Sequence, residues 1–482
     1  MTEVDRIVGW LGRWASGRGP LYLLLAVRLR ALIDDGLLAP GSALPPDRVL
    51  AQRLAVGRGT VVAAYDLLQQ EGRLVRRQGS GTRVAEAELP TTRAAEGVSN
   101  PLLLHVLDPP DGVLLLTCAA PVEPPPVLVA AYQEAAARLG RVRHDIGYYP
   151  AGHPELRQAV AAYYTARGLP TEPGEILITN GGQQAIALIT ALLVAPGDTV
   201  RLETPTYPSA IEIFRNAGAL VSPCELDETH ERGVLLPREP EVGKPALAYL
   251  VPTAHNPTGR VMPALARRRL AAWAAEADVP LIDDEVPAEL CFDGVTPPPL
   301  ARFARGEQIL TVASLSKLVW GGLRVGWIRA SAALISRLAR LRAIHDLGGD
   351  VLAQLAATAL LGRLDEVRAA RVTTLRARHD HLRAELAAHL PSWSCPPALG
   401  GQTLWVRLPR GDAGAFAQLT ARHGVAVPPG SAFDVAGDHA ACLRLPFVHP
   451  EPELSDGVRR LAAAWAAYDG TRRRAALQPL VV

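Results

Sequence analysis

The fold is decided by the stretch Ser314-Leu315-Ser316-Lys317-Leu318-Val319-Trp320-Gly321-Gly322-Leu323-Arg324-Val325-Gly326. Lys317 is one of only two lysines in the chain, and the other, Lys244, reads as a solvated loop charge. A lysine amine condenses with an aldehyde only when it is neutral, and burial near other cations lowers its pKa. The hydroxyls of Ser314 and Ser316 and the guanidinium of Arg324 suit a phosphate dianion. The stretch therefore predicts a Schiff-base lysine and a cofactor with an aldehyde and a phosphate, as in pyridoxal phosphate.

Length and charge divide the chain. At 482 residues it is long enough for two to four domains of about 150 residues each. The net charge is only +2, but residues 19–85 hold nine arginines and five acidic residues, which gives this segment +4. A basic first segment on a mildly acidic remainder indicates an anionic partner at the N-terminus.

Several classes of protein are excluded by simple patterns. The five cysteines are far apart and no histidines cluster at ligand spacing, so neither a disulfide framework nor a metal site is predicted. Acidic residues occur within the first five positions and no apolar segment follows, so no secretory signal is predicted. The longest apolar run, residues 185–195, is shorter than the roughly 20 residues that cross a bilayer. We expect a cytoplasmic protein without membrane contact.

Residues 20–85 read as a winged helix-turn-helix, preceded by an N-terminal extension over 1–19. Helical periodicity begins at Leu21 and stops at Asp35-Gly36, and a second helix runs from Asp47, its expected cap, to about Leu54. A third helix spans 58–70, with Val61 and Tyr65 facing the core. Two short strands, 73–77 and 82–85, flank the turn at 78–81 and form the wing.

This segment resembles the GntR family of DNA-binding regulators. The shared patterns are Pro-Leu-Tyr, Gly-x-x-Leu-Pro-x-x-Arg-x-Leu-Ala, Arg-x-Thr-Val-x-x-Ala-Tyr and a Gly-x-Gly wing. The resemblance implies contacts with double-stranded DNA from Arg48, Arg58, Thr60, Gly79 and Gly81. Gly57 replaces the usual serine cap, and Gly59 and Val62 stand where polar residues are common. Phosphate contacts are therefore expected to outweigh base contacts.

Residues 86–111 read as an interdomain linker. Periodicity is lost over most of this segment, which is rich in proline, threonine and glutamate. Its 26 residues could extend over about 85 Å. A second domain is expected over 112–470, followed by a C-terminal tail over 471–482.

The second domain alternates short apolar strands with polar turns. The run Glu175–Asn180 is followed by Gly181-Gly182-Gln183-Gln184, which opens an apolar helix and offers free backbone N–H groups to a phosphate. Later turns place Tyr207 and Asn256 after strands, and a buried strand runs into Asp284. A carboxylate facing a pyridine nitrogen keeps that nitrogen protonated.

These motifs resemble fold-type I aminotransferases, which are α/β proteins with a large domain built on a mixed, mainly parallel sheet and a small C-terminal α+β subdomain. The resemblance implies that Tyr207 stacks on the cofactor ring, that Asn256 binds its phenolic oxygen and that Asp284 faces its nitrogen. The implied phosphate and Schiff-base residues are Gly182, Gln183, Ser314, Ser316, Lys317 and Arg324. Arg444 would clamp a substrate α-carboxylate.

Two departures from the aminotransferase pattern bear on activity. Val286 stands where the family has a tyrosine that also binds the phenolic oxygen, which puts efficient turnover in doubt. Gly147 stands where a tyrosine reaches the partner's cofactor, so Tyr148 could serve only if the loop shifts by one residue.

Together the two halves resemble the MocR/GabR-type regulators, in which a GntR head is fused to an aminotransferase-like domain. The implied function is a DNA-binding transcriptional regulator that binds pyridoxal phosphate on Lys317 and senses an amino acid or amine, or the cofactor itself, as a head-to-tail homodimer. The alternative is a working aminotransferase with an appended DNA-binding domain. The operator, the sign of regulation and the effector are not encoded in any motif.

Overall fold

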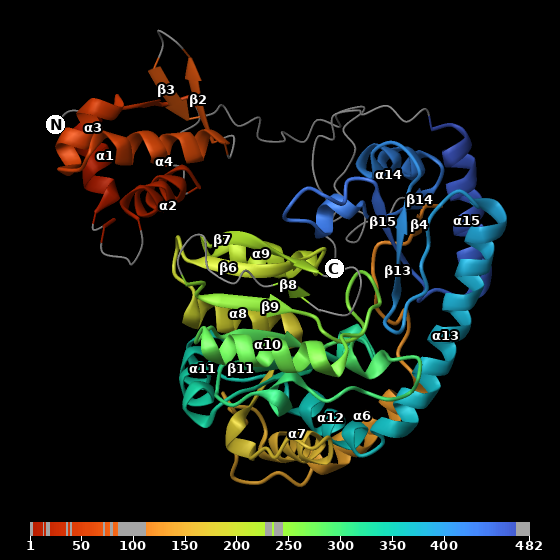
Figure 1. Ribbon diagram of the computed structural model, residues 1–482. Coiled ribbons are helices and arrows are strands. Elements are labelled where there is room, and N and C mark those ends of the chain that lie inside the picture. The colour runs from red at the N-terminus through yellow and green to blue at the C-terminus, as the bar shows by residue number, and fades with distance from the viewer. Residues whose placement is uncertain are drawn as a thin grey trace. The chain divides into compact units, whose positions relative to one another are not determined.

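The computed structural model describes residues 3–12, 14–15, 20–34, 37–38, 41–70, 73–77, 81–84, 112–226, 234–235 and 244–468. The chain divides into two compact units, which are described separately (Figure 1). The predicted linker at 86–111, the tail at 471–482 and the wing residue Gly79 lie outside the described residues.

The first unit is a winged helix-turn-helix. Its elements are α1 Glu3–Leu11, α2 Leu21–Asp34, β1 Ala43–Leu44, α3 Asp47–Leu54, α4 Arg58–Gln70, β2 Leu74–Arg77 and β3 Gly81–Val84. The three strands form one antiparallel sheet in the order β1-β3-β2. Val61 and Tyr65 of α4 are fully buried, and Tyr65 Oη donates to Pro45 O over 2.9 Å.

Two details of this unit differ from the sequence prediction. The N-cap of α3 is Pro46, and Asp47 is the first helical residue instead of the cap; Asp47 Oδ2 accepts a hydrogen bond from Arg58 Nε over 3.0 Å. The N-terminal extension contains the helix α1, whose Ile7 and Leu11 are buried in the core of the unit. Arg28 of α2 donates to the carbonyl groups at the end of α1.

The second unit is built on an eight-stranded sheet in the order β5-β12-β11-β10-β9-β6-β7-β8. Its strands are β5 Ile176–Thr179, β6 Thr199–Thr204, β7 Leu220–Leu226, β8 Val234–Leu235, β9 Leu247–Leu250, β10 Leu281–Asp284, β11 Ile309–Ser314 and β12 Gly326–Arg329. The central strands β6, β9, β10 and β11 pair in parallel, whereas β12 is antiparallel to β11 and β5. The predicted mixed, mainly parallel sheet is confirmed.

Helices cover both faces of this sheet, and its central strands are buried. All residues of β5, β9, β10 and β11 are buried, as is typical of a parallel sheet between helical layers. The helices of this part are α6 Pro126–Leu139, α7 Pro154–Ala166, α8 Gly182–Leu193, α9 Pro208–Asn216, α10 Ala264–Glu276, α11 Ala332–His345 and α12 Val351–Leu361. In Figure 1, α10 lies across the sheet in front of the strands.

A smaller C-terminal subdomain follows the long helix α13 Leu364–His389. It contains β13 Thr403–Arg407, α14 Ala413–Arg422, β14 Val425–Ala426, β15 Cys442–Pro446 and α15 Glu451–Ala466. β13 and β15 pair antiparallel, and β14 pairs in parallel with β4 Leu114–Leu115 from the start of the domain. Trp393, Phe416 and Trp465 pack edge to face in its core. Within the described residues, no helix combines the length and the apolar composition that crossing a bilayer requires.

Candidate functional site

A cavity of about 310 Å³ lies at the carboxyl ends of the parallel strands in the second unit. Ligands bind at this edge of α/β sheets because the strands there end in loops. The cavity is lined by eight of the nine residues that the sequence assigned to a cofactor: Gly182, Gln183, Tyr207, Asn256, Asp284, Ser316, Lys317 and Arg324. These residues come from five separate segments of the chain, so the fold brings together motifs that are far apart in the sequence.

Lys317 occupies the turn between β11 and β12 and lines the cavity. Burial lowers the pKa of its amine, and the positive charges of Arg444 and Arg324 lower it further, whereas Cys118 and Asp284 act in the opposite direction. A lowered pKa increases the share of neutral amine, which is the nucleophilic form. Lys244 lies elsewhere: its exposed ammonium is 2.7 Å from Asp278 Oδ2.

Two glycines at the N-terminus of α8 allow close packing at the end of the cavity that is expected to bind phosphate. Gly181 has a φ of +92° and is the N-cap of α8, whose first-turn N–H groups have no acceptor within the helix. Arg324 lies so close that a Cβ at Gly181 would be 2.8 Å from Arg324 Nη2, and Arg324 donates to the carbonyl oxygen of Asn180. A Cβ at Gly182 would be 2.8 Å from Val286 Cγ2. The two glycines thus allow Arg324 and Val286 to approach the N-terminus of α8, where a guanidinium and free backbone N–H groups together suit a phosphate.

Asp284 ends β10 and faces the cavity, whereas the preceding Asp283 is turned away and accepts from Leu300 N over 2.8 Å. Burial raises the pKa of Asp284 to about 6, although two hydrogen bonds oppose this shift. Val286 N donates to Oδ1 over 2.9 Å, and Tyr249 Oη donates to Oδ2 over 2.5 Å.

Tyr249 was missed by the sequence analysis. It lies in β9 within the apolar run Leu247–Leu250 and is fully buried. The only signal in the sequence is a hydroxyl inside an apolar strand, which requires a buried partner. The identity of that partner depends on the pairing of β9 with β10, in which Tyr249 is opposite Ile282.

Ser314 is the one expected cofactor residue that does not line the cavity. Its hydroxyl donates to Val325 O over 2.9 Å and lies 3.1 Å from Ser316 Oγ. Because Ser314 ends β11, this hydrogen bond closes the turn that carries Lys317. The structure therefore places Ser314 in support of the turn and Ser316 at the cavity.

Arg444, the expected carboxylate clamp, is fully buried in β15 next to the cavity. Its Nη1 lies 3.4 Å from Asn256 Oδ1, and its Nη2 donates to the carbonyl oxygen of Thr117. Its Nε is buried and has no hydrogen-bond partner among the described residues. A buried guanidinium with an unused donor suits an anionic ligand group.

The two departures noted in the sequence have different surroundings. Val286 lines the cavity, and its side chain has no hydroxyl that could bind a phenolic oxygen. Tyr148 lies in an exposed loop outside the cavity and is 62% exposed. Tyr148 is not among the described residues that line the cavity.

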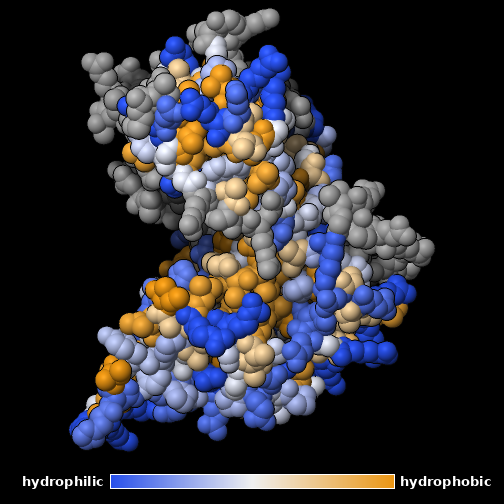
Figure 2. All heavy atoms as spheres, turned by 90° about the vertical axis from the view of Figure 1, so that its left-hand side faces the viewer, coloured by the Kyte–Doolittle hydropathy of each residue, from blue (hydrophilic) through white to orange (hydrophobic). Residues whose placement is uncertain are grey.

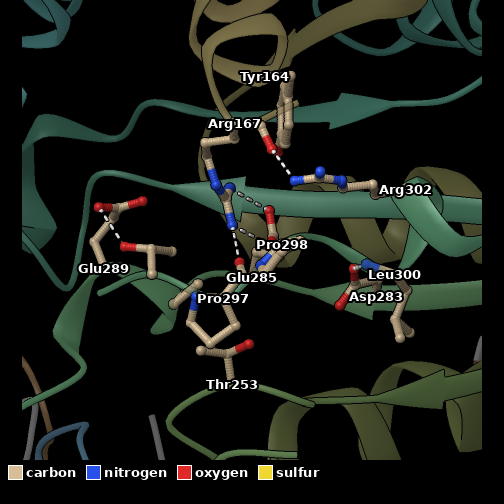
Figure 3. A network of polar contacts seen from close by, with 12 residues as sticks. Tyr164, Arg167, Thr253, Asp283, Glu285, Glu289, Pro297, Pro298, Leu300 and Arg302 are labelled. Atoms are coloured by element: carbon tan, nitrogen blue, oxygen red, sulfur yellow. Dashed lines mark hydrogen bonds and ion pairs between the residues drawn. The ribbon is translucent and has the colours of Figure 1, made fainter. Parts of the chain in front are cut away.

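A buried ion pair lies directly behind the acidic end of β10. Arg167 binds Glu285 bidentately, with Nη1 and Nη2 at 2.9 and 2.8 Å from the two carboxylate oxygens (Figure 3). Arg167 Nη2 also donates to Pro297 O over 2.8 Å. Bidentate pairing fixes both partners in orientation, so the residue following Asp284 is held firmly in place.

The residues around the cavity fit pyridoxal phosphate. A helix N-terminus with an arginine suits its phosphate, a buried carboxylate suits its ring nitrogen, and a lysine with a lowered pKa suits its aldehyde. Within the described part of the chain, no group of three or more His, Cys, Asp and Glu side chains could hold a metal ion.

Four of the five expected DNA-contacting residues are described, and each is at least partly exposed. Arg48 and Gly81 are exposed, Thr60 is half-buried, and the Arg58 side chain is 61% exposed. Gly57 and Gly59 flank Arg58, and a Cβ at either position would meet no atom within 4 Å. The start of α4 is therefore open.

Residues 113–461 match the family of class I and class II aminotransferases, and the chain belongs to this family. Residues 21–84 match the bacterial regulatory proteins of the gntR family, so the chain joins a GntR winged helix-turn-helix to an aminotransferase domain. This is the two-domain arrangement that the sequence motifs predicted, and the aminotransferase fold implies pyridoxal phosphate as the cofactor class.

The similar proteins include transcriptional regulators and aminotransferases. The chain is 28% identical to the uncharacterized HTH-type transcriptional regulator YisV of Bacillus subtilis (strain 168), over 94% of this chain and 98% of that protein. It is 30% identical to the HTH-type pyridoxine biosynthesis transcriptional regulator PdxR of Corynebacterium glutamicum, over 78% and 81%. The crystal structure of the α-aminoadipate aminotransferase LysN from Thermus thermophilus matches 77% of this chain and 95% of its own, with a TM-score of 0.67 and 28% identity.

Proposed function

We propose that this protein is a cytoplasmic DNA-binding transcriptional regulator that binds pyridoxal phosphate through Lys317 and senses an amino compound or the cofactor itself. The proposed domains are the winged helix-turn-helix over 20–85 and the cofactor-binding domain over 112–470, joined by the linker at 86–111. One observation carries the proposal: a chain with a GntR domain also holds Lys317, Asp284 and Arg324 around a single cavity.

The side chains of the cavity divide the work of binding. The cofactor, when bound, supplies an aldehyde for amines and a ring that withdraws electrons. Gly182, Gln183, Ser316 and Arg324 hold its phosphate, and Tyr207 packs on its ring. Asn256 hydrogen-bonds its phenolic oxygen, and Asp284 holds the proton at its nitrogen. Arg444 binds the carboxylate of an amino acid effector. The amino group of that effector would compete with Lys317 for the aldehyde carbon.

The DNA-binding side of the proposal depends on α3, the start of α4 and the wing. Arg48, Arg58, Thr60 and Gly81 supply phosphate and groove contacts, together with Gly79. Few polar side chains stand at base-facing positions, because Gly59 and Val62 occupy two of them. We therefore assign most of the affinity to phosphate contacts, which makes binding strongly dependent on salt.

A head-to-tail homodimer is part of the proposal. Ile146, Tyr148, Ile344 and Leu347 are 83%, 62%, 85% and 45% exposed, which is unusual for apolar side chains in two adjoining segments. The two segments lie side by side, so that a Cβ at Gly348 would be only 2.5 Å from Tyr149 O. Apolar side chains also gather on the face of the second unit that Figure 2 displays. Extended apolar surface of this kind marks interaction sites.

The test compares the wild-type protein with Lys317→Ala. Purified protein would be titrated with pyridoxal phosphate, and the visible absorbance of the lysine-linked cofactor would be recorded. Binding to a library of DNA fragments would be measured with and without the cofactor and a panel of amino acids. The proposal expects a new absorbance band in wild type only and a DNA affinity that responds to the cofactor or to an amino acid. An identical spectrum from Lys317→Ala would refute the lysine assignment.

Transamination is the second candidate function, and the site itself favours it. The cavity combines Lys317, Asp284 and the adjacent Arg444, which are the proton carrier, the ring partner and the carboxylate site that such a reaction requires. Val286 is the missing part. A single-turnover experiment with amino acids separates the two functions, because rapid conversion to the amine form of the cofactor identifies an enzyme and a stable amino acid adduct identifies a sensor.

Sensing of the cofactor alone is supported by a relative. PdxR is named as a regulator of pyridoxine biosynthesis and shares 30% of its residues with this chain over the aligned region. If this chain senses the cofactor, DNA affinity changes on addition of pyridoxal phosphate without any amino acid.

A further inference from the structure

Asp284 has a buried partner that the proposed function does not use. Tyr249 Oη donates to Asp284 Oδ2 over 2.5 Å from the neighbouring strand β9. The side chain of Tyr249 is fully buried, and its ring meets Phe214 of α9 edge to face, with 5.9 Å between the ring centroids. The hydroxyl therefore has a fixed direction and a single role, which is to donate to this carboxylate.

We propose that Tyr249 is the positioning residue of the cofactor site: its hydroxyl orients the Asp284 carboxylate and keeps it ionised, so that Asp284 holds a proton on the ring nitrogen of the cofactor. This inference rests on the proposed function, because it concerns the same cavity.

The geometry leaves Asp284 with free acceptor capacity on the cavity side. An ionised carboxylate has about four lone-pair positions. Val286 N occupies one on Oδ1 and Tyr249 Oη occupies one on Oδ2, both from within the protein. Since Asp284 also lines the cavity, the remaining positions are available to a ring nitrogen without reorientation of the side chain.

The charges around Asp284 make this donor necessary. Burial favours the protonated carboxyl, and Glu203 of β6 acts in the same direction, whereas Tyr249, Val286 N and Lys317 favour the carboxylate. The balance raises the pKa of Asp284 to about 6, so the group is still mainly ionised at neutral pH. Burial raises the pKa of Tyr249 well above its ordinary value, so Tyr249 remains a donor throughout the physiological range. Loss of the hydroxyl would move the pKa of Asp284 up toward neutrality.

Glu203 cannot replace Tyr249 as a donor to Asp284, because an ionised carboxylate only accepts hydrogen bonds. Its Oε1 accepts from Val251 N over 2.5 Å and lies 3.2 Å from His255 Nε2. Both side chains of this pair are buried. Glu203 thus contributes a second negative charge behind the cavity and increases the need for a donor at Asp284.

The test uses Tyr249→Phe, which removes one hydroxyl and keeps the ring against Phe214. Tyr164→Phe is the matched control, because Tyr164 is also fully buried and its hydroxyl accepts from Trp327 Nε1 over 3.0 Å, away from Asp284. Full-length protein would be loaded with pyridoxal phosphate labelled with ¹⁵N in the ring. Two quantities would be measured at pH 7: the ring ¹⁵N chemical shift and the dissociation constant of the cofactor.

We expect Tyr249→Phe to move the ¹⁵N shift toward the unprotonated pyridine value and to raise the dissociation constant about tenfold. Tyr164→Phe should leave both quantities at the wild-type values. The double variant Tyr249→Phe/Asp284→Asn separates positioning from a general effect on folding. Tyr249→Phe should add nothing to the effect of Asp284→Asn, because the hydroxyl acts only through the carboxylate.

Three results would overturn the inference. An unchanged ¹⁵N shift in Tyr249→Phe removes the positioning role, and so does an additive loss of affinity in the double variant. Failure of the wild-type protein to bind the cofactor would overturn the proposed function together with this inference, whereas normal wild-type binding with no response to Tyr249→Phe would overturn this inference alone.

Discussion

Gln184 Nε2 donates to Asp346 Oδ2 over 2.7 Å, although 162 residues separate the two in the chain. The same oxygen accepts from Asn180 Nδ2 over 3.1 Å, and the other accepts from Arg342 Nε at the same distance. Asn180 and Gln184 bracket the glycines of the phosphate turn. Asp346 thus ties the cradle proposed for the cofactor phosphate to the turn after α11.

Replacing Asp346 should weaken cofactor binding. In Asp346→Asn, an amide group would face the donors of Gln184 and Asn180, so at least one hydrogen bond to a charged acceptor is lost. We expect the dissociation constant of pyridoxal phosphate to rise about tenfold, as measured by absorbance titration. Asp350→Asn is the control, since Asp350 caps α12 and is bonded to Leu352 N and Ala353 N instead. Equal affinities in the two variants would contradict the role of Asp346.

Breaking the buried pair behind β10 should destabilise the second unit. The Arg167 and Glu285 side chains are 12% and 1% exposed, so Arg167→Met leaves an uncompensated buried carboxylate. The expected loss is about 3–5 kcal/mol in the free energy of unfolding, measured by urea denaturation. The exposed pair of Arg215 and Glu212 is the comparison, and Arg215→Met should cost no more than about 1 kcal/mol. Similar losses at both positions would contradict the importance of burial.

Asp283 should make stability fall as the pH rises. Its pKa is raised by burial and by the negative charge of Glu285. The pKa of Asp283 in the unfolded chain is about 4. Above pH 4, Asp283 is therefore protonated more often in the native protein than in the unfolded chain, so the free energy of unfolding decreases as the pH rises toward the native pKa. Asp283→Asn keeps an acceptor for Leu300 N and removes the titration. The melting temperature should fall less steeply with rising pH in Asp283→Asn than in the wild type. An equal pH dependence in the two proteins would contradict the role of Asp283.

Arg58 and Arg53 offer a matched test of the DNA-binding face. Both side chains are exposed and paired, but Arg58 lies at the start of α4 and is 3.0 Å from Asp47 of α3, whereas Arg53 is bound to Asp5 of α1 at 2.8 Å. Arg58→Ala should lower DNA affinity about tenfold at physiological salt and reduce the slope of log K against log salt by about 0.9. Arg53→Ala should change neither quantity. Fluorescence anisotropy at four salt concentrations would measure both, and a similar effect of the two variants would count against this face.

Local sequence patterns were sufficient to predict most of the residues that line the cavity. Gly182, Asn256 and Lys317 belong to short motifs that follow buried strands, and parallel strands bring such positions to one edge of a sheet. The helix α1 could also have been found, because Val4, Ile7, Val8 and Leu11 recur at helical spacing.

Other parts of the site depend on contacts that no local pattern encodes. Tyr249 meets Asp284 only through the pairing of β9 with β10, and Asp346 meets Gln184 only after α11 has packed beside α8. The surroundings of Ser314 could not be predicted for a related reason. A serine two residues before the lysine suits a phosphate equally well in the sequence, but the strand geometry of β11 directs its hydroxyl to Val325.

The scarcity of lysine gives this protein a built-in chemical label. A reductant that makes the link between Lys317 and a carbonyl compound permanent would have a single competing side chain, the exposed Lys244. Trypsin cleaves after Arg305 and Arg324, so a modified Lys317 would leave residues 306–324 as one peptide, whereas the free lysine would allow cleavage into two. Occupancy of the cavity could therefore be read by mass spectrometry, even in a crude cell extract.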